Sequence, residues 1–136
     1  MIGVIVVTHG RVAIELVNAA RIIAGDLPQF DAVSIGWHDD PTIAREAISQ
    51  AIDRVQSPDG VLILTDMFGG TPSNLGLTFL ATNRVEIITG VNLPMLIKLA
   101  HLQTSSDLLA VAREMREVGR NAIWVASDLL HVEAQA

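Results

Sequence analysis

The sequence has no cysteine, and Lys98 is the only lysine among its 136 residues. The absence of cysteine excludes disulfides, thiolate nucleophiles and cysteine-ligated metal sites. A formal net charge of −6 argues against nonspecific binding to nucleic acid or to anionic membranes. No apolar run is long enough to span a bilayer, and Met1 leads into a predicted strand without the basic start of a signal peptide. We therefore expect a cytoplasmic protein that binds no nucleic acid and does not insert into a membrane.

The composition and the periodicity of apolar residues predict one α/β domain. Half of the residues are hydrophobic and 18% are charged, as in ordinary globular proteins. Apolar runs alternate with segments that have helical spacing, which is typical of a doubly wound, mostly parallel sheet with helices on both faces. We expect a domain over residues 1–126 and a flexible tail over 127–136. The five strands are predicted at 2–7, 30–36, 61–65, 85–89 and 121–126, and the helices at 11–24, 41–55, 72–80, from 94 to about 102, and 108–118.

The first predicted strand runs out at Thr8, His9 and Gly10, just before a helix begins. In an α/β protein this junction lies at the carboxyl edge of the sheet, where ligands bind. A histidine at this edge is exposed enough to react and is held by regular structure on both sides. We therefore take His9 as the candidate reactive group.

A second strand-to-helix junction follows the strand at 61–65 and has the sequence DMFGGTPSN over residues 66–74. Gly69 and Gly70 have no Cβ, so their backbone can approach a ligand closely. Thr71 is the expected N-cap of the next helix, with Pro72 at the first helical position. The free N–H groups of this turn and the hydroxyls of Thr71 and Ser73 predict an anion site. Taken alone, Gly-Gly-Thr-Pro is more typical of a tight turn with a good cap, because such turns are common.

Asp66 directly follows a buried strand, so its carboxylate should lie at the sheet edge beside His9. It could merely cap the following turn. A carboxylate beside an imidazole accepts the N–H of one ring nitrogen, fixes the tautomer and stabilises the ring when it becomes positive. Together with an anion site, the pair indicates a histidine nucleophile that is transiently phosphorylated. This chemistry needs no metal, and we expect no metal or cofactor because no acidic cluster is arranged to hold magnesium.

A receiver domain is an alternative class with a similar succession of strands and helices. Its chemistry needs acidic residues after the first strand and a lysine after a late strand. Here the first strand ends in Thr8 and His9, and Lys98 falls in a predicted helix. The sequence therefore disfavours a receiver domain.

Three segments together resemble the IIA component of the mannose-type phosphotransferase system (PTS), and the similarity extends to about Ala126. They are IGVIVVTHG at 2–10, DMFGGTPSN at 66–74 and IITGVNLPML at 87–96. The resemblance implies that His9 accepts a phosphoryl group from phosphohistidine HPr and passes it to a IIB domain. It also implies that Asp66 orients the imidazole and that Gly70, Thr71 and Ser73 surround the phosphoryl group.

The resemblance further implies a homodimer in which an antiparallel last strand, residues 121–126, is exchanged between subunits. It implies association with the membrane components IIC and IID as well. Candidate partner-facing residues are Arg11, Trp37, Phe68 and Pro94. Trp37 and Phe68 are aromatic, and aromatic residues are enriched at binding hot spots. Arg11 could attract an incoming phosphoryl group, and Pro94 belongs to the segment expected at the partner-facing rim of the site. An alternative function is a regulatory module outside transport, in which the phosphorylation state of His9 is a signal to a protein partner.

Overall fold

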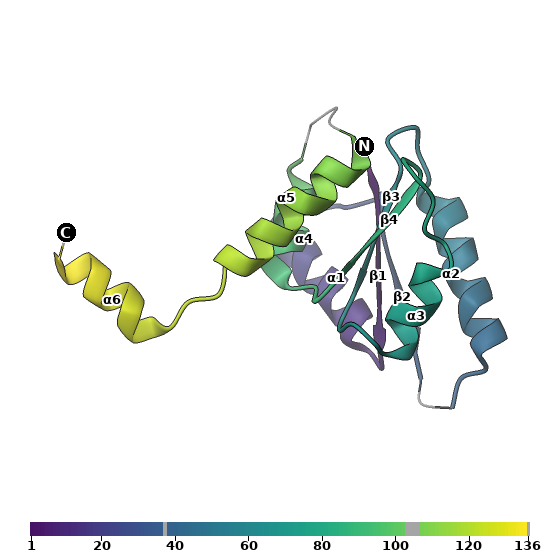
Figure 1. Cartoon of the computed structure of the whole chain (residues 1–136), viewed down its shortest axis with the longest axis horizontal. Helices are drawn as coiled ribbons and strands as arrows, with labels where there is room; N and C mark the ends of the chain where they lie inside the picture. The colour runs from purple at the N-terminus through teal and green to yellow at the C-terminus, as the bar shows by residue number, and fades with distance from the viewer. Residues whose placement is uncertain (37, 103–106, 136) are drawn as a thin grey trace.

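The computed structural model describes residues 1–36, 38–102 and 107–135, and these residues form four strands and six helices (Figure 1). The strands are β1 (Gly3–His9), β2 (Phe30–Ile35), β3 (Val61–Thr65) and β4 (Val85–Thr89). The helices are α1 (Val12–Ala24), α2 (Pro41–Val55), α3 (Thr71–Leu77), α4 (Leu93–Ala100), α5 (Leu108–Asn121) and α6 (Ala126–Gln135). Elements predicted from the apolar pattern are therefore found up to residue 121.

The sheet is parallel throughout and has the order β2-β1-β3-β4. The two inner strands are apolar along almost their whole length because helices cover them on both faces. The chain moves from β1 outward to β2 and then returns to place β3 on the other side of β1. The order of strands thus reverses between β1 and β3, which is where open α/β sheets bind ligands. The predicted α/β class and parallel arrangement are confirmed.

Two layers of helices bury the sheet (Figure 1). On one face α1, α4 and α5 pack over the side chains of Val4, Val6 and Leu62. On the other face α2 and α3 pack over Ile5 and Val7. Alternate residues of β1 therefore serve two separate cores, and this double burial fixes the strand end that carries His9.

Polar caps set where several helices begin. Asp40 accepts a hydrogen bond from the Thr42 amide at 2.8 Å, and Pro41 occupies the first helical position of α2. Asp107 caps α5 through the Ala110 amide at 2.8 Å. Asn92 caps α4 by accepting from the Met95 amide at 3.2 Å. These caps agree with the polar residue that precedes each apolar helical pattern.

The fifth strand predicted at 121–126 is not formed within the described chain. Asn121 belongs to the last turn of α5, residues 122–125 have no regular structure, and α6 follows. A strand needs a neighbouring edge to pair with, and this segment leads away from the sheet of its own chain (Figure 1). The segment predicted as a flexible tail is helical over Ala126–Gln135.

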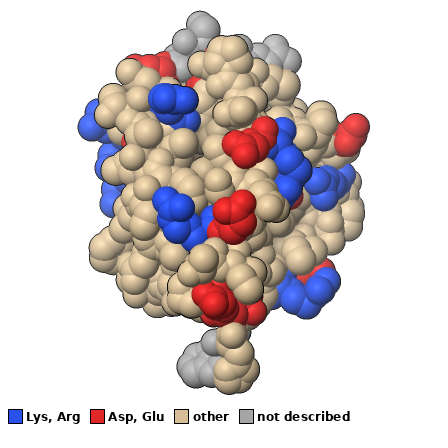
Figure 2. Space-filling view, turned by 90° about the vertical axis from the view of Figure 1, so that its right-hand side faces the viewer, with Lys and Arg blue, Asp and Glu red and all other residues tan. Residues whose placement is uncertain are grey.

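The face covered by α2 and α3 carries basic and acidic side chains that alternate over its surface (Figure 2). It therefore presents no broad area of one charge. Among the described residues, no helix combines the length and the apolar character that crossing a bilayer requires.

Candidate phosphorylation site

His9 is the last residue of β1, which ends two residues later than the apolar pattern predicted. The amide of Gly10 donates to the Ile35 carbonyl at 2.9 Å, which holds the strand end against β2. The buried Thr8 hydroxyl accepts from the Ala13 amide at 2.6 Å and donates to the His9 carbonyl at 3.1 Å. It therefore joins the start of α1 to the end of β1. Thr8 was missed as a site residue, because a threonine in an apolar run looks like a strand former.

Asp66 follows β3 and contacts His9 across the reversal in strand order. Its Oδ2 accepts a hydrogen bond from the His9 backbone amide at 3.0 Å and lies 2.8 Å from His9 Nδ1. Its Oδ1 accepts from the Met67 amide at 3.0 Å. The structure therefore brings together the two residues predicted to form the reactive pair.

Two opposing effects act on the Asp66 carboxyl. Burial raises its pKa, because it disfavours the charged form. The hydrogen bonds from the backbone and ring of His9, the charge of His9 and the bond from Met67 outweigh burial, and the pKa of Asp66 lies below its ordinary value. An ionised carboxylate can only accept hydrogen bonds, so Nδ1 of His9 carries the proton. The lone pair of the neutral imidazole is therefore on Nε2.

Gly70 lies against the His9 ring. A Cβ built on Gly70 would stand 2.7 Å from Cε1 and 3.1 Å from Nε2 of His9, so only glycine fits without displacing the imidazole. The nitrogen that holds the lone pair thus faces the backbone that begins α3. The His9 side chain is 48% exposed, so the ring is open to solvent.

The loop 66–74 is arranged differently from the sequence expectation in one respect. Gly70, not Thr71, is the N-cap of α3: its backbone is extended, and its carbonyl accepts from the Asn74 amide at 3.0 Å. Thr71 is the first helical residue and is exposed. The helix begins one residue earlier than the sequence predicted, because Gly70 occupies the N-cap position although it has no side chain to cap with. In the described part of the chain, no hydrogen bond involves the amide N–H of Gly70 or Thr71.

Ser73 is completely buried, whereas the sequence suggested a hydroxyl aimed at a bound anion. Its Oγ accepts from the Gly69 amide at 2.9 Å and donates to the Gly70 carbonyl at 3.0 Å. Gly69 itself adopts a φ of 92°, a conformation that favours glycine. The predicted phosphoryl-binding residues therefore lie together at the start of α3, but the Ser73 hydroxyl is bonded to the loop that precedes the helix.

The candidate partner-facing residues are spread over the surface. Arg11 is exposed, and its Nη2 lies 3.5 Å from Oε1 of Glu15. Phe68 is 73% exposed. Pro94 lines a separate apolar groove of about 510 Å³ between α1, α4 and α5. Trp37 lies outside the described residues. Met67, 56% exposed beside Phe68, was missed because an isolated methionine carries little signal in a sequence.

The third motif, residues 87–96, is hydrogen-bonded to the end of β3, directly before Asp66. The carbonyl of Thr65, the residue before Asp66, accepts from the amides of Gly90 at 2.9 Å and Val91 at 3.0 Å. Asn92 caps α4 and also donates from Nδ2 to the Gly119 carbonyl at 3.1 Å.

No group of three or more metal-binding side chains occurs in the ranges the structure describes.

The family described as the PTS system fructose IIA component, EIIA-Man, matches residues 3–115. The chain belongs to this family of phosphotransfer components of sugar phosphotransferase systems, and the resemblance predicted from its three motifs is confirmed.

Relatives and a solved structure agree with this assignment. The PTS system fructose-specific EIIA component of Bacillus subtilis (strain 168) is 30% identical over 96% of this chain and 90% of its own length. The mannose-specific EIIAB component of Escherichia coli (strain K12) is 26% identical, and the match covers 90% of this chain and 39% of that longer protein. The PTS IIA protein associated with the fucose utilization operon of Streptococcus pneumoniae has a TM-score of 0.82 at 25% identity, and the match covers 94% of this chain and 95% of that one.

Proposed function

We propose that this protein is a phosphocarrier in which His9 accepts a phosphoryl group from phosphohistidine HPr and passes it to a IIB domain. The observation that carries the proposal is the 2.8 Å contact between His9 Nδ1 and Asp66 Oδ2, with Nε2 turned toward Gly70. This arrangement supports Nε2 as the nucleophile, because it leaves the lone pair on that nitrogen. The name of the E. coli relative, a mannose-specific EIIAB component, is consistent with a IIB acceptor.

The proposed transfer begins when Nε2 of His9 attacks the phosphorus atom of the donor. The new N–P bond forms as the donor's N–P bond breaks, and that electron pair returns to the donor nitrogen. The His9 ring becomes positive as the donor ring becomes neutral, and the Asp66 carboxylate stabilises the positive ring through the Nδ1 proton. The amides of Gly70 and Thr71 supply donors for the phosphoryl oxygens. Transfer to the IIB domain reverses these steps with a different acceptor.

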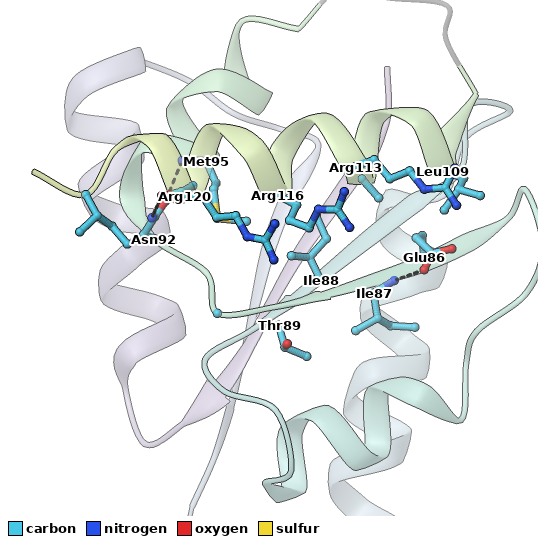
Figure 3. Close-up of a pocket in the computed structure, with 14 residues that line it drawn as sticks. Glu86, Ile87, Ile88, Thr89, Asn92, Met95, Leu109, Arg113, Arg116 and Arg120 are labelled. Carbon is cyan, nitrogen blue, oxygen red and sulfur yellow. Dashed lines mark hydrogen bonds between the residues drawn. The ribbon is translucent and has the colours of Figure 1, made fainter.

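Residues 121–126 of a second copy are the proposed occupant of a groove beside β4. In the described chain β4 pairs along its length with β3, and Val85 at its start also bridges Ala81, so the outer edge is open beyond Val85. The groove measures about 480 Å³ and lies between this edge and α5 (Figure 3). It is lined by Ile87, Thr89, Leu109, Arg113, Arg116 and Arg120 among others.

The segment after α5 has the apolar surface that such an exchange would bury. Ile123, Trp124 and Val125 are 76%, 63% and 63% exposed, and the segment extends away from the body (Figure 1). Exposed runs of this kind mark interaction sites. An antiparallel strand exchanged in a homodimer accounts for both the open edge and the apolar segment.

We place the protein in the cytoplasm, where it would associate with the IIC and IID membrane components through its IIB partner.

The test is phosphorylation in a reconstituted system. The protein is incubated with phosphoenolpyruvate, enzyme I and HPr, and its intact mass is measured at neutral pH before and after acid treatment. We expect an acid-labile phosphoryl adduct on the wild type and on His101→Ala, a matched variant of an exposed histidine in the C-cap of α4. We expect none on His9→Ala. An unmodified wild type, or an adduct that persists in His9→Ala, would contradict the proposal.

The acceptor separates transport from regulation. A purified IIB domain is added to the phosphorylated protein, and loss of the adduct is followed with time. Rapid transfer supports the transport role. An adduct that is stable toward every IIB domain tested supports the alternative, a regulatory module that reports its phosphorylation state.

A further inference from the structure

The Ser73 hydroxyl has both of its hydrogen-bonding roles filled by the loop that precedes it. It accepts from the Gly69 amide at 2.9 Å and donates its only proton to the Gly70 carbonyl at 3.0 Å. The residue is completely buried in the first turn of α3. To contact a phosphoryl group, the hydroxyl would have to break its bond to Gly70 and leave a buried position.

One of the two residues that Ser73 holds, Gly70, lies against the reactive ring. The Gly70 carbonyl also accepts from the Asn74 amide at 3.0 Å, so two donors fix the orientation of this peptide. The Gly70 backbone approaches Cε1 and Nε2 of His9 so closely that no Cβ fits between them. A rotation of the Gly70 peptide would therefore change the surroundings of Nε2 directly.

We propose that Ser73 is a positioning residue for phosphoryl transfer, a role that rests on the proposed function of His9. It holds the Gly69–Gly70 turn in the conformation that places Gly70 against Nε2 before any phosphoryl group arrives. It acts through the loop and does not touch the phosphoryl group. This differs from the role of Thr71, which is exposed at the first helical position.

Two consequences distinguish positioning from contact. Loss of the hydroxyl changes the surroundings of the His9 ring in the unphosphorylated protein, whereas loss of a phosphoryl contact does not. Loss of the Ser73 hydroxyl also lowers the maximal rate of phosphorylation. It leaves the KM for the donor protein unchanged, because the exposed residues Met67 and Phe68 are not altered. A misplaced reacting group lowers a rate by on the order of 10².

The experiment compares Ser73→Ala with Ser73→Cys, which keeps a weak donor and acceptor of similar size. The matched control is Thr78→Ala, because the Thr78 hydroxyl also donates to a carbonyl of α3, that of Leu75 at 2.6 Å, but at the far end of the helix. Nitrogen-15 NMR of the unphosphorylated variants records the His9 ring nitrogens and the amides of Gly69, Gly70 and Thr71. Phosphorylation by HPr then gives the maximal rate and KM.

We expect Ser73→Ala to shift the His9 ring and loop amide signals without any donor present and to slow phosphorylation by 10-fold to 100-fold. Ser73→Cys should recover part of both effects, and Thr78→Ala should match the wild type. Unchanged ring signals in Ser73→Ala would overturn the proposal, whether or not its rate falls. If the wild type is not phosphorylated, the proposed function fails, but the NMR comparison still decides whether Ser73 positions Gly70 against His9. Should Ser73→Ala not fold, Ser73→Cys provides the same comparison.

Discussion

One oxygen of Asp66 accepts from both the backbone amide and the ring of His9, at 3.0 Å and 2.8 Å. The imidazole is therefore oriented relative to its own peptide, which the sheet holds in place. Because the second oxygen accepts from the Met67 amide, the carboxylate cannot rotate without losing a bond. A single carboxylate thus fixes the tautomer and the direction of the reactive ring together.

The lowered pKa of Asp66 determines how its contribution to stability varies with pH. The unfolded chain takes up this proton near the ordinary value of 3.8, and the folded chain at a lower pH. The interaction therefore stabilises the fold fully above 3.8, and this stabilisation is lost as the pH falls through the folded pKa. We expect Asp66→Asn to lower the free energy of unfolding by about 1 kcal/mol at neutral pH. Urea unfolding over a series of pH values should show the difference narrowing below 3.8.

Asp53→Asn, at an exposed position on α2, is the control for loss of one negative charge. A difference between Asp66→Asn and wild type that stays constant or grows in acid would show that the carboxylate does not act in this way. Asp66→Asn should also take up a phosphoryl group more slowly than the wild type at neutral pH, because the neutral amide of asparagine does not stabilise a positive ring.

Gly70→Ala should displace the His9 ring or the loop, since its Cβ would stand 2.7 Å from Cε1. We expect the phosphorylation rate to fall by on the order of 10². Gly76→Ala is the control on the same helix, because its Cβ would meet only ordinary contacts of 3.7 Å or more. The measurement is the rate of adduct formation by mass spectrometry. A wild-type rate in Gly70→Ala would mean that the close approach of backbone and ring is not needed.

Asn92 joins two helices, so its replacement should reduce stability in two separable parts. Asn92→Ala removes the cap on the Met95 amide and the bond to the Gly119 carbonyl. We expect a loss of roughly 1–2 kcal/mol in the free energy of unfolding. Asn92→Ser can still cap α4 and should recover about half of it. Equal losses for both variants in denaturant unfolding would show that the cap contributes little.

Phe68→Ala tests the partner-facing role of the most exposed phenylalanine near the site, at 73% exposure. We expect a several-fold rise in the KM for phosphorylated HPr, and a change in unfolding free energy of about 0.5 kcal/mol or less. Leu80→Ala, 53% exposed beyond the end of α3, is the control for loss of exposed apolar surface. An unchanged KM in Phe68→Ala would remove this residue from the docking surface.

Deletion of residues 122–136 should convert the proposed dimer to a monomer, because it removes the segment that would occupy the β4 groove. Trp124→Ala should weaken the dimer by a smaller amount. Light scattering over a range of protein concentrations measures both effects. Ile22→Ala, 85% exposed on α1, is the control for an apolar residue outside the segment. A full-length protein that stays monomeric at high concentration would contradict strand exchange.

The sequence was sufficient to predict the parallel fold, because continuous apolar strands such as β3 and helices with clear caps such as α2 are local patterns. It also predicted that Asp66 would lie near His9, since both follow inner strands. The fifth strand at 121–126 was not found, because a strand depends on an edge that a local pattern does not reveal. The direction of the Ser73 hydroxyl and the contact of Gly70 with His9 depend on backbone geometry. Residue types alone do not specify such geometry.

The contact between His9 and Gly70 has a consequence for how such carriers diversify. The reactive nitrogen is faced by main-chain atoms, and main chain offers the same groups whatever the sequence around it. Discrimination between donors and acceptors must then come from side chains outside the contact, such as those of Met67 and Phe68. Substitutions there can redirect the protein to a new pathway while the chemistry stays intact.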